Sequence, residues 1–491
     1  MEILCRENSG KIDREIKVLQ FGEGNFLRGF VDYMIDLANE NGVFDGDIVI
    51  AKPIEAGELT FFEKQECQYT VQLRGLVDEE ARCLSRIVTS VADAVDTYSE
   101  YEKYAAYAKL DSLRFIVSNT TEAGIVYDDT DCMAFTPPKS YPGKLTKFLY
   151  DRYQYFNGAK DKGLIILPVE LIDDNGIQLK KCVTKLTKRW GLGDAFLEWL
   201  NEACIFTSTL VDRIITGYPK DEAEKIWLEL GYQDNLLVTG EPFALWVIES
   251  EQDISREFPL HKAGLPVIFT DNQKPYKQRK VRILNGAHTS FALAAYLAGK
   301  EYVLEAMQDE LLLSFVKKTV YEEIIPTLTL PKEELETFAE AVFARFFNPY
   351  VKHALLAISL NSVSKWKARC LPSFLEYIEK EERLPWHLTF SLAALLAFYT
   401  GTEIREGALI GHRGEEEYRI LDDAFVLEFF AENSMKDMSE YVKAVLGKVD
   451  FWGCDLCGIA GVEEAVTGYL SEIRTLGMRG ALTQLLGSSQ M

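Results

Sequence analysis

The sequence has little that would place the chain in a membrane, on a secretory route or on a nucleic acid. Its best apolar candidate, residues 390–399, falls short of the roughly 18 residues that a membrane-spanning helix needs. The N-terminal segment lacks the apolar core of a secretory signal. Lysine and arginine number 53 against 76 aspartates and glutamates, which gives a net charge of −23. Because such a chain repels phosphate backbones and anionic lipid, we predict neither a nucleic-acid partner nor a membrane partner.

Cysteines are few and scattered. The sequence has 9 of them, an odd number, which favours reduced thiols in a cytoplasmic protein over a disulfide framework. Cys454 and Cys457 form one CxxC motif, but a zinc finger usually needs a second pair, and the sequence has none. We therefore predict no metal site and interpret the motif as structural, with zinc binding or redox chemistry as the alternative.

The pattern of apolar residues changes along the chain. In the first half, short apolar runs at 16–21, 47–51, 115–117 and 163–168 read as strands, and a helix is expected over 25–39. After about residue 275 the period becomes helical, with helices expected over 281–298, 304–325, 333–347 and 385–399. The 491 residues therefore predict an α/β domain with a largely parallel sheet over 1–275 and a mostly α-helical domain over 276–491.

A glycine turn joins the first predicted strand to the first predicted helix. Two glycines, in a G-x-G pattern, allow a tight turn and let backbone amides approach a pyrophosphate, and the helix N-terminus then favours the anion. The third glycine of the usual fingerprint is replaced by Leu27, so an ordinary strand-to-helix turn is the alternative. The residues assigned to dinucleotide binding here are Phe21, Gly22, Gly24, Asn25, Phe26 and Arg28.

Two further segments bear on the cofactor. The second strand ends without the acidic residue that usually holds the ribose hydroxyls, so NAD and NADP both stay open. Lys52 at that position either meets a 2′-phosphate or is a solvated loop lysine, and we favour the second reading. A loop over 118–124, after the third strand, carries Thr121 and Glu122, which we assign to the cofactor-facing edge of the sheet.

Three polar side chains fall on one side of the helix expected from residue 281. At 100° per residue, Lys280, Asn285 and His288 share an arc of about 140° on an otherwise apolar helix. An amide and an ammonium stabilise a developing alkoxide, and a buried lysine exchanges a proton near neutrality. The alternative is ordinary polar capping with a histidine bonded in the core.

Basic residues gather in two segments of this acidic chain, 274–282 and 365–369. Charge runs are usually solvated surfaces. The other interpretation is a local positive site for an anionic substrate, with Lys365, Lys367 or Arg369 holding a carboxylate.

The chain resembles the mannitol dehydrogenase family of polyol and aldonate dehydrogenases. The resemblance spans nearly the whole chain and rests on these segments and spacings: Gly22-x-Gly24-x-Phe26-x-Arg28, Thr121-Glu122-x-Gly124, Val211-Asp212-Arg213-Ile214, residues 241–249, and Lys280-x4-Asn285-x2-His288. It implies a Rossmann-type domain with NAD, followed by a mostly helical domain. It also implies hydride transfer without a metal, with Lys280 as the acid–base, Asn285 and His288 stabilising and orienting the substrate, and Asp212 at the substrate edge.

One departure from the family concerns the substrate. Polyol members usually carry a Cys-Asp-Asn segment after the strand near residue 167, and Leu171 stands here in place of the asparagine that helps to hold the substrate oxygen. Together with segments 19–28, 282–289 and 358–365, this resembles the members that act on keto-uronates, so that Lys365 and Arg369 would meet the uronate carboxylate. The implied reaction is NADH-dependent reduction of D-tagaturonate to D-altronate in hexuronate catabolism. The alternatives are reduction of fructuronate, then mannitol 2-dehydrogenase activity, and a non-catalytic nucleotide sensor; the sequence leaves a monomer and a homodimer both open.

Overall fold

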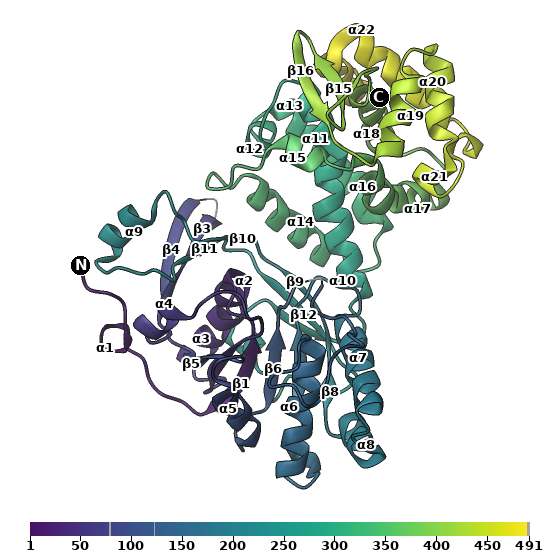
Figure 1. Ribbon diagram of the computed structural model, residues 1–491. Helices are drawn as coiled ribbons and strands as arrows, with labels where there is room; N and C mark the ends of the chain where they lie inside the picture. The colour runs from purple at the N-terminus through teal and green to yellow at the C-terminus, as the bar shows by residue number, and fades with distance from the viewer. Residues whose placement is uncertain (78–79, 122, 489–491) are drawn as a thin grey trace. The chain divides into compact units, whose positions relative to one another are not determined.

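The structure is a computed structural model that describes residues 1–77, 80–121 and 123–488. The chain forms two compact units, Met1–Gln273 and Lys274–Met491, whereas the expected domain boundary follows residue 275. Figure 1 shows a sheet flanked by helices in the first unit and a mostly helical second unit.

The first unit is built on a six-stranded sheet in which every neighbouring pair is parallel. Its order is β5 (Val91–Asp96), β2 (Asp47–Lys52), β1 (Ile16–Phe21), β6 (Phe115–Ser118), β7 (Ile165–Pro168) and β8 (Ile205–Phe206). All six residues of β2 are buried, as expected for a parallel strand covered on both faces. The four predicted strands are thus confirmed as β1, β2, β6 and β7, and the Rossmann-type sheet with them.

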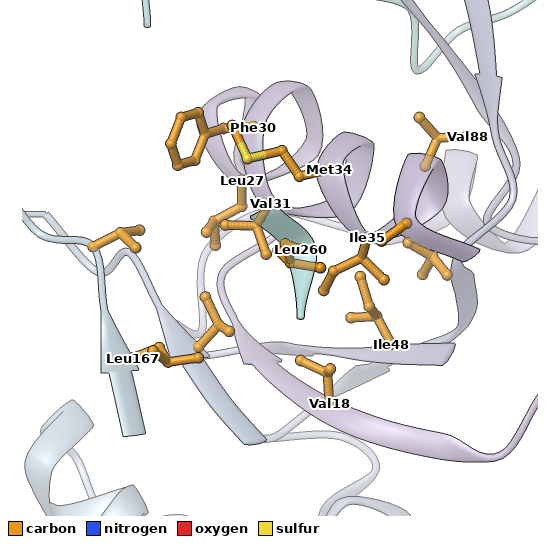
Figure 2. Packing of buried hydrophobic residues seen from close by; sticks show 14 of the residues in the cluster. Val18, Leu27, Phe30, Val31, Met34, Ile35, Ile48, Val88, Leu167 and Leu260 are labelled. Atoms are coloured by element: carbon orange, nitrogen blue, oxygen red, sulfur yellow. The ribbon is translucent and has the colours of Figure 1, made fainter. Parts of the chain in front are cut away.

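The helix after β1 begins at Asn25, as predicted, and ends at Glu40. It consists of α2 (Asn25–Leu27), a π-helical segment η1 (Arg28–Asp32) and α3 (Tyr33–Glu40). Figure 2 shows Leu27, Val31 and Ile35 below this helix, toward Val18 and Ile48 of the sheet. The apolar side of the helix therefore fixes the glycine turn at the carboxyl end of β1.

Two smaller sheets in this unit were not predicted. One has the order β10 (Ile215–Gly217), β11 (Val238–Gly240), β3 (Tyr69–Val77) and β4 (Glu80–Val88), and the other β13 (Val267–Thr270), β12 (Leu245–Glu249) and β9 (Ser208–Asp212). The remaining α-helices of the unit are α1 (Arg6–Ser9), α4 (Thr60–Lys64), α5 (Tyr101–Ala106), α6 (Tyr141–Tyr155), α7 (Asn175–Arg189), α8 (Asp194–Glu202) and α9 (Ala223–Leu230).

The second unit is mostly helical, as predicted. It contains α10 (Lys274–Arg279), η5 (Lys280–Gly286), α11 (Ala287–Leu297), α12 (Val303–Met307), α13 (Glu310–Lys318), η6 (Thr319–Ile324), α14 (Lys332–Phe346), α15 (Leu355–Ser359), α16 (Ser362–Arg369), α17 (Leu371–Glu381), α18 (Trp386–Phe398), α19 (Ala424–Asn433), α20 (Met438–Leu446), α21 (Val449–Trp452) and α22 (Val462–Ser488). A sheet of β14 (Ile404–Arg405), β15 (Ala408–Arg413) and β16 (Glu416–Ile420) was not predicted. None of the described helices combines the length and the apolar character needed to cross a bilayer.

One predicted helix of this unit is divided. The expected helix over 304–325 breaks before Asp309, whose carboxylate accepts from Leu311 N and Leu312 N and so begins a new helix. An aspartate at this position satisfies amides that have no partner within the helix. The apolar periodicity continued through the break, and this is why the sequence pattern did not reveal it.

Candidate functional site

The glycine turn has the backbone that the sequence predicted. Gly22 has a φ of 121°, and a Cβ placed there would stand 3.1 Å from both Asn119 O and Leu27 Cδ1. A side chain at Gly24 would meet nothing within 4 Å, so this position opens toward free space. Gly22 therefore serves the turn itself, and Gly24 leaves the backbone accessible to a ligand.

Two other residues assigned to this turn, Arg28 and Phe26, make contacts within the protein. Arg28 is buried, and its guanidinium donates to Glu23 O at 3.1 Å, to Asn25 Oδ1 at 2.6 Å and to Leu236 O. Phe26 stacks on Phe30, with ring centroids 5.0 Å apart. These contacts give Arg28 and Phe26 a role in holding the turn.

The loop after β6 is fixed by a buried acid that sequence reasoning did not single out. Glu170, 2% exposed, accepts from Ser118 Oγ at 3.1 Å, Thr120 N at 3.0 Å and Thr120 Oγ1 at 2.9 Å. Leu171, beside it, is 65% exposed. Thr121 follows in the left-handed region with a φ of 72°, and Glu122 lies outside the described residues. An acidic residue directly after an apolar strand was the sequence signal that could have identified Glu170.

A cavity of about 650 Å³ lies over the carboxyl edge of the parallel sheet. Phe21 does not line it but packs on the lining residue Tyr141, with ring centroids 5.0 Å apart. Tyr141 is the first residue of α6, whose N-terminus is capped by Ser140. The lining residues include Gly22, Gly24, Ile54, Asn119, Thr120, Thr121, Lys139 and Ser140. The turn and the second loop thus meet at one site, as parallel strands require.

The structure places Lys52 neither in contact with solvent nor free to bind a 2′-phosphate, the two roles that the sequence left open. It is 0% exposed, so it is not a solvated lysine. Its Nζ donates to Ile54 O at 2.7 Å and Glu55 O at 3.0 Å, and stands 3.0 Å from Asp96 Oδ2. Because an ammonium has three N–H groups, this arrangement leaves Lys52 no donor for a 2′-phosphate.

Asp212 ends β9 and is buried. The guanidinium of Arg213, next to it, donates to Gly29 O at 2.8 Å, Pro242 O at 3.0 Å and Phe243 O at 3.0 Å. Arg213 therefore ties the strand that carries Asp212 to the helix behind the glycine turn.

In the second unit, Lys280 and Asn285 lie in a π-helix and not in the α-helix that the sequence analysis assumed. The π-helical segment is Lys280–Gly286, and regular α-helix resumes at Ala287. In a π-helix the backbone hydrogen bond joins residues i and i+5, and each turn holds more residues than in an α-helix, so residues five apart lie closer together around the axis. The expected angles are therefore corrected, and Lys280 and Asn285 stand closer together around the axis than predicted.

His288 lies in an aromatic and cationic environment. Its ring lies 4.2 Å from Phe346 and 5.0 Å from His353, measured between centroids, and its Nε2 is buried without a hydrogen-bond partner among the described residues. Burial lowers the pKa of His288 well below its ordinary value, and His353, Arg345, Arg369 and Lys365 lower it further. His288 is thus a neutral imidazole at physiological pH. His353 was missed because no spacing in the sequence links it to residue 288.

Helix α16 packs directly on the segment that carries Gly286 and Thr289. A Cβ at Gly286 would stand 3.2 Å from Arg369 O, and Arg369 Nη1 lies 3.3 Å from Thr289 Oγ1. Lys365 Nζ donates to Ile358 O at 2.9 Å. Lys367 points elsewhere, because its Cε lies against Gly453. The structure therefore places Lys365 and Arg369, but not Lys367, near His288.

A parallel dinucleotide-type sheet with a glycine turn, followed by a helical unit carrying a lysine, an amide and an imidazole, defines a dehydrogenase of the Rossmann class. Residues 16–262 match the mannitol dehydrogenase Rossmann domain and residues 272–474 the mannitol dehydrogenase C-terminal domain. The chain belongs to the mannitol dehydrogenase family.

Curated relatives agree over almost the full length. Altronate oxidoreductase of Pectobacterium carotovorum is 44% identical over 490 residues, 98% of this chain and 99% of that protein. Altronate oxidoreductase of an Escherichia coli strain is 45% identical over 476 residues, 96% of each chain. Among solved structures, a D-sorbitol dehydrogenase in substrate-free form gives a TM-score of 0.79 at 20% identity, covering 98% of this chain and 100% of that one. Pseudomonas fluorescens mannitol 2-dehydrogenase, in a ternary complex with NAD and D-mannitol, gives 0.64 at 19% identity, covering 99% and 100%. The two solved structures share the fold.

Proposed function

We propose that the chain is an NAD-dependent oxidoreductase that reduces D-tagaturonate to D-altronate. The observation that carries the proposal is the packing of α16, with Lys365 and Arg369, on the segment that bears Lys280, Asn285 and His288. The packing places positive groups beside residues that can reduce a carbonyl. A substrate with a carboxylate requires such groups, because they form charge-assisted hydrogen bonds with it. The relatives named altronate oxidoreductase support the same substrate.

The residues of the first unit fit a dinucleotide. Gly24 leaves room for a pyrophosphate, and the helix that begins at Asn25 directs its N-terminal amides toward that space. The cavity continues past Asn119 and Thr120, held by Glu170. Because Lys52 is fully engaged, the first unit supports NAD over NADP. When bound, NADH supplies the hydride.

The side chains of the second unit account for the proton and the charge. Lys280 donates a proton to the carbonyl oxygen of the substrate as the alkoxide develops. Asn285, five residues later in the same π-helical segment, donates a hydrogen bond to the same oxygen. Neutral His288 orients the substrate without competing as an acid. We place Asp212 at the substrate edge and the uronate carboxylate on Lys365 and Arg369.

The test follows NADH absorbance with purified protein and, separately, tagaturonate, fructuronate and fructose, with NADPH in parallel. We expect turnover on tagaturonate with NADH. Preference for fructuronate would retain the mechanism and change the substrate. Turnover on fructose alone would refute the carboxylate site. Bound NADH without turnover on any of the three would favour a nucleotide sensor.

The state of the cysteines bears on the proposed cellular location. All nine cysteines are free in the structure, which supports a reducing compartment, and we therefore propose the cytoplasm.

A further inference from the structure

Three buried polar side chains form a network beneath the glycine turn. Gln20, Asp32 and Tyr69 are each 0% exposed and come from β1, η1 and β3. Gln20 Nε2 donates to Gly22 O at 3.2 Å and to Asp32 Oδ2 at 3.3 Å, and Tyr69 Oη donates to the same Asp32 Oδ2 at 2.6 Å. A single amide thus connects the Asp32 carboxyl to the carbonyl of the turn.

Two oxygens of this network are buried without a hydrogen-bond partner within the described residues. They are Gln20 Oε1 and Asp32 Oδ1. The amide oxygen is always an acceptor, and the Asp32 oxygen is also only an acceptor when the carboxyl group is ionised. A buried acceptor without a donor costs free energy. A proton on Asp32 Oδ1 converts one of these two acceptors into a donor. Because a carboxylic acid and an amide can pair through both of their polar atoms, and Gln20 Nε2 already donates to Asp32 Oδ2, we infer that Gln20 Oε1 accepts this proton's hydrogen bond.

The groups around Asp32 have opposing effects on its pKa, and together they do not keep it ionised. Arg28 on the same helix favours the carboxylate, as do the donors Tyr69 and Gln20, whereas Asp36 on α3 opposes it. Burial outweighs the favourable groups and raises the pKa of Asp32 to about 7.

We propose that Asp32 is a positioning residue for the dinucleotide turn, and that its protonated form, paired with Gln20, holds Gly22 in the conformation that binds the dinucleotide. This inference rests on the proposed NAD site. Ionisation of Asp32 leaves two unpaired acceptors under the turn and puts a negative charge on the helix that receives the phosphates. Dinucleotide affinity is therefore highest when Asp32 is protonated and falls as the pH rises.

The test measures the Kd of NADH by fluorescence titration from pH 6.0 to 8.5. For the unaltered protein we expect Kd to rise at least about threefold over this range, with a limit of about tenfold per pH unit above the midpoint. Asp32→Asn keeps a donor at the position of the proton and cannot ionise, so its Kd should stay low and flat. In turnover the effect should appear in the KM for NADH and leave kcat unchanged.

Two further variants separate positioning from folding. Asp36→Asn removes the negative neighbour, so the rise should persist with its midpoint at lower pH. Gln20→Leu breaks the link to Gly22, so NADH binding should already be weak at pH 6 and show little further change. A flat profile in the unaltered protein, or an unchanged rise in Asp32→Asn, would overturn the inference. Failure of the unaltered protein to bind NADH at any pH would instead overturn the proposed function.

Discussion

Asn285 stands five residues after Lys280, the span of one π-helical hydrogen bond, in the segment Lys280–Gly286. In an α-helix the same spacing would turn the two side chains about 140° apart. The π-helix therefore brings Lys280 and Asn285 closer together around the helix axis than an α-helix would, as the proposed contact of both side chains with one substrate oxygen requires.

Removal of the proton donor should affect chemistry more than binding. For Lys280→Ala we expect kcat to fall by at least about 10²-fold, the scale of general acid–base catalysis. Steady-state kinetics with NADH and tagaturonate measure this. Lys332→Ala, at an exposed lysine of the same unit, is the control and should leave kcat unchanged. A near-normal kcat for Lys280→Ala would remove the lysine from its assigned role.

Removal of the anion-holding groups should affect KM. Lys365→Ala combined with Arg369→Ala should raise the KM for tagaturonate by about 10- to 100-fold, because charge-assisted hydrogen bonds to a carboxylate are lost. The matched control is Lys367→Ala on the same helix, whose side chain lies against Gly453. If the double variant and the control behave alike, the carboxylate binds elsewhere.

Lys52 should prove a structural residue. Lys52→Met leaves Asp96 and several carbonyl oxygens without their cation, so we expect a loss of about 3 kcal/mol in the free energy of unfolding. The ratio of kcat/KM for NADH and NADPH should stay the same. Urea unfolding and kinetics with both nucleotides test this, and a changed nucleotide preference would return Lys52 to the cofactor site.

Asp32 should also make stability depend on pH. Its pKa is raised from an ordinary value of 3.8 to about 7, so its contribution is fully present below 3.8 and is lost as the pH rises through 7. We compare the free energy of unfolding of Asp32→Asn with that of the unaltered protein at each pH. The difference should favour the variant by at least about 1 kcal/mol more at pH 8 than at pH 5. Urea midpoints at the two pH values measure the gain, and a difference that does not vary with pH would contradict it.

Strong local patterns predicted much of the first unit. The apolar runs of β1, β2, β6 and β7 and the glycine turn are short-range signals, and all were placed correctly. The hairpin of β3 and β4 and the sheet of β9, β12 and β13 depend on pairing between distant segments, which periodicity does not report.

The site was predictable only where its residues share a short segment. The spacing of Lys280, Asn285 and His288 predicts a site that stays a prediction, and it does not indicate the π-helix, because a wider turn carries no residue signature. Glu170, Asp32 and His353 make their contacts with residues that are distant in the sequence, so local spacing does not reveal them. The prediction that Lys52 is solvated was wrong. A lysine at a strand end is usually exposed, and the sequence does not show that the loop carrying Glu55 and the side chain of Asp96 bind its ammonium group.

Gly286 sets how closely α16 approaches the segment Lys280–Gly286. With no side chain there, the backbone of α16 at Arg369 can stand directly on this segment, and Cys370 Sγ lies 3.6 Å from Gly286 O. Any larger residue would push the cationic helix outward by a few tenths of an ångström or more. We therefore expect the range of accepted substrates to depend on how closely these two backbones approach as well as on charge, so that a larger residue at Gly286 should change the preference between longer and shorter sugar acids.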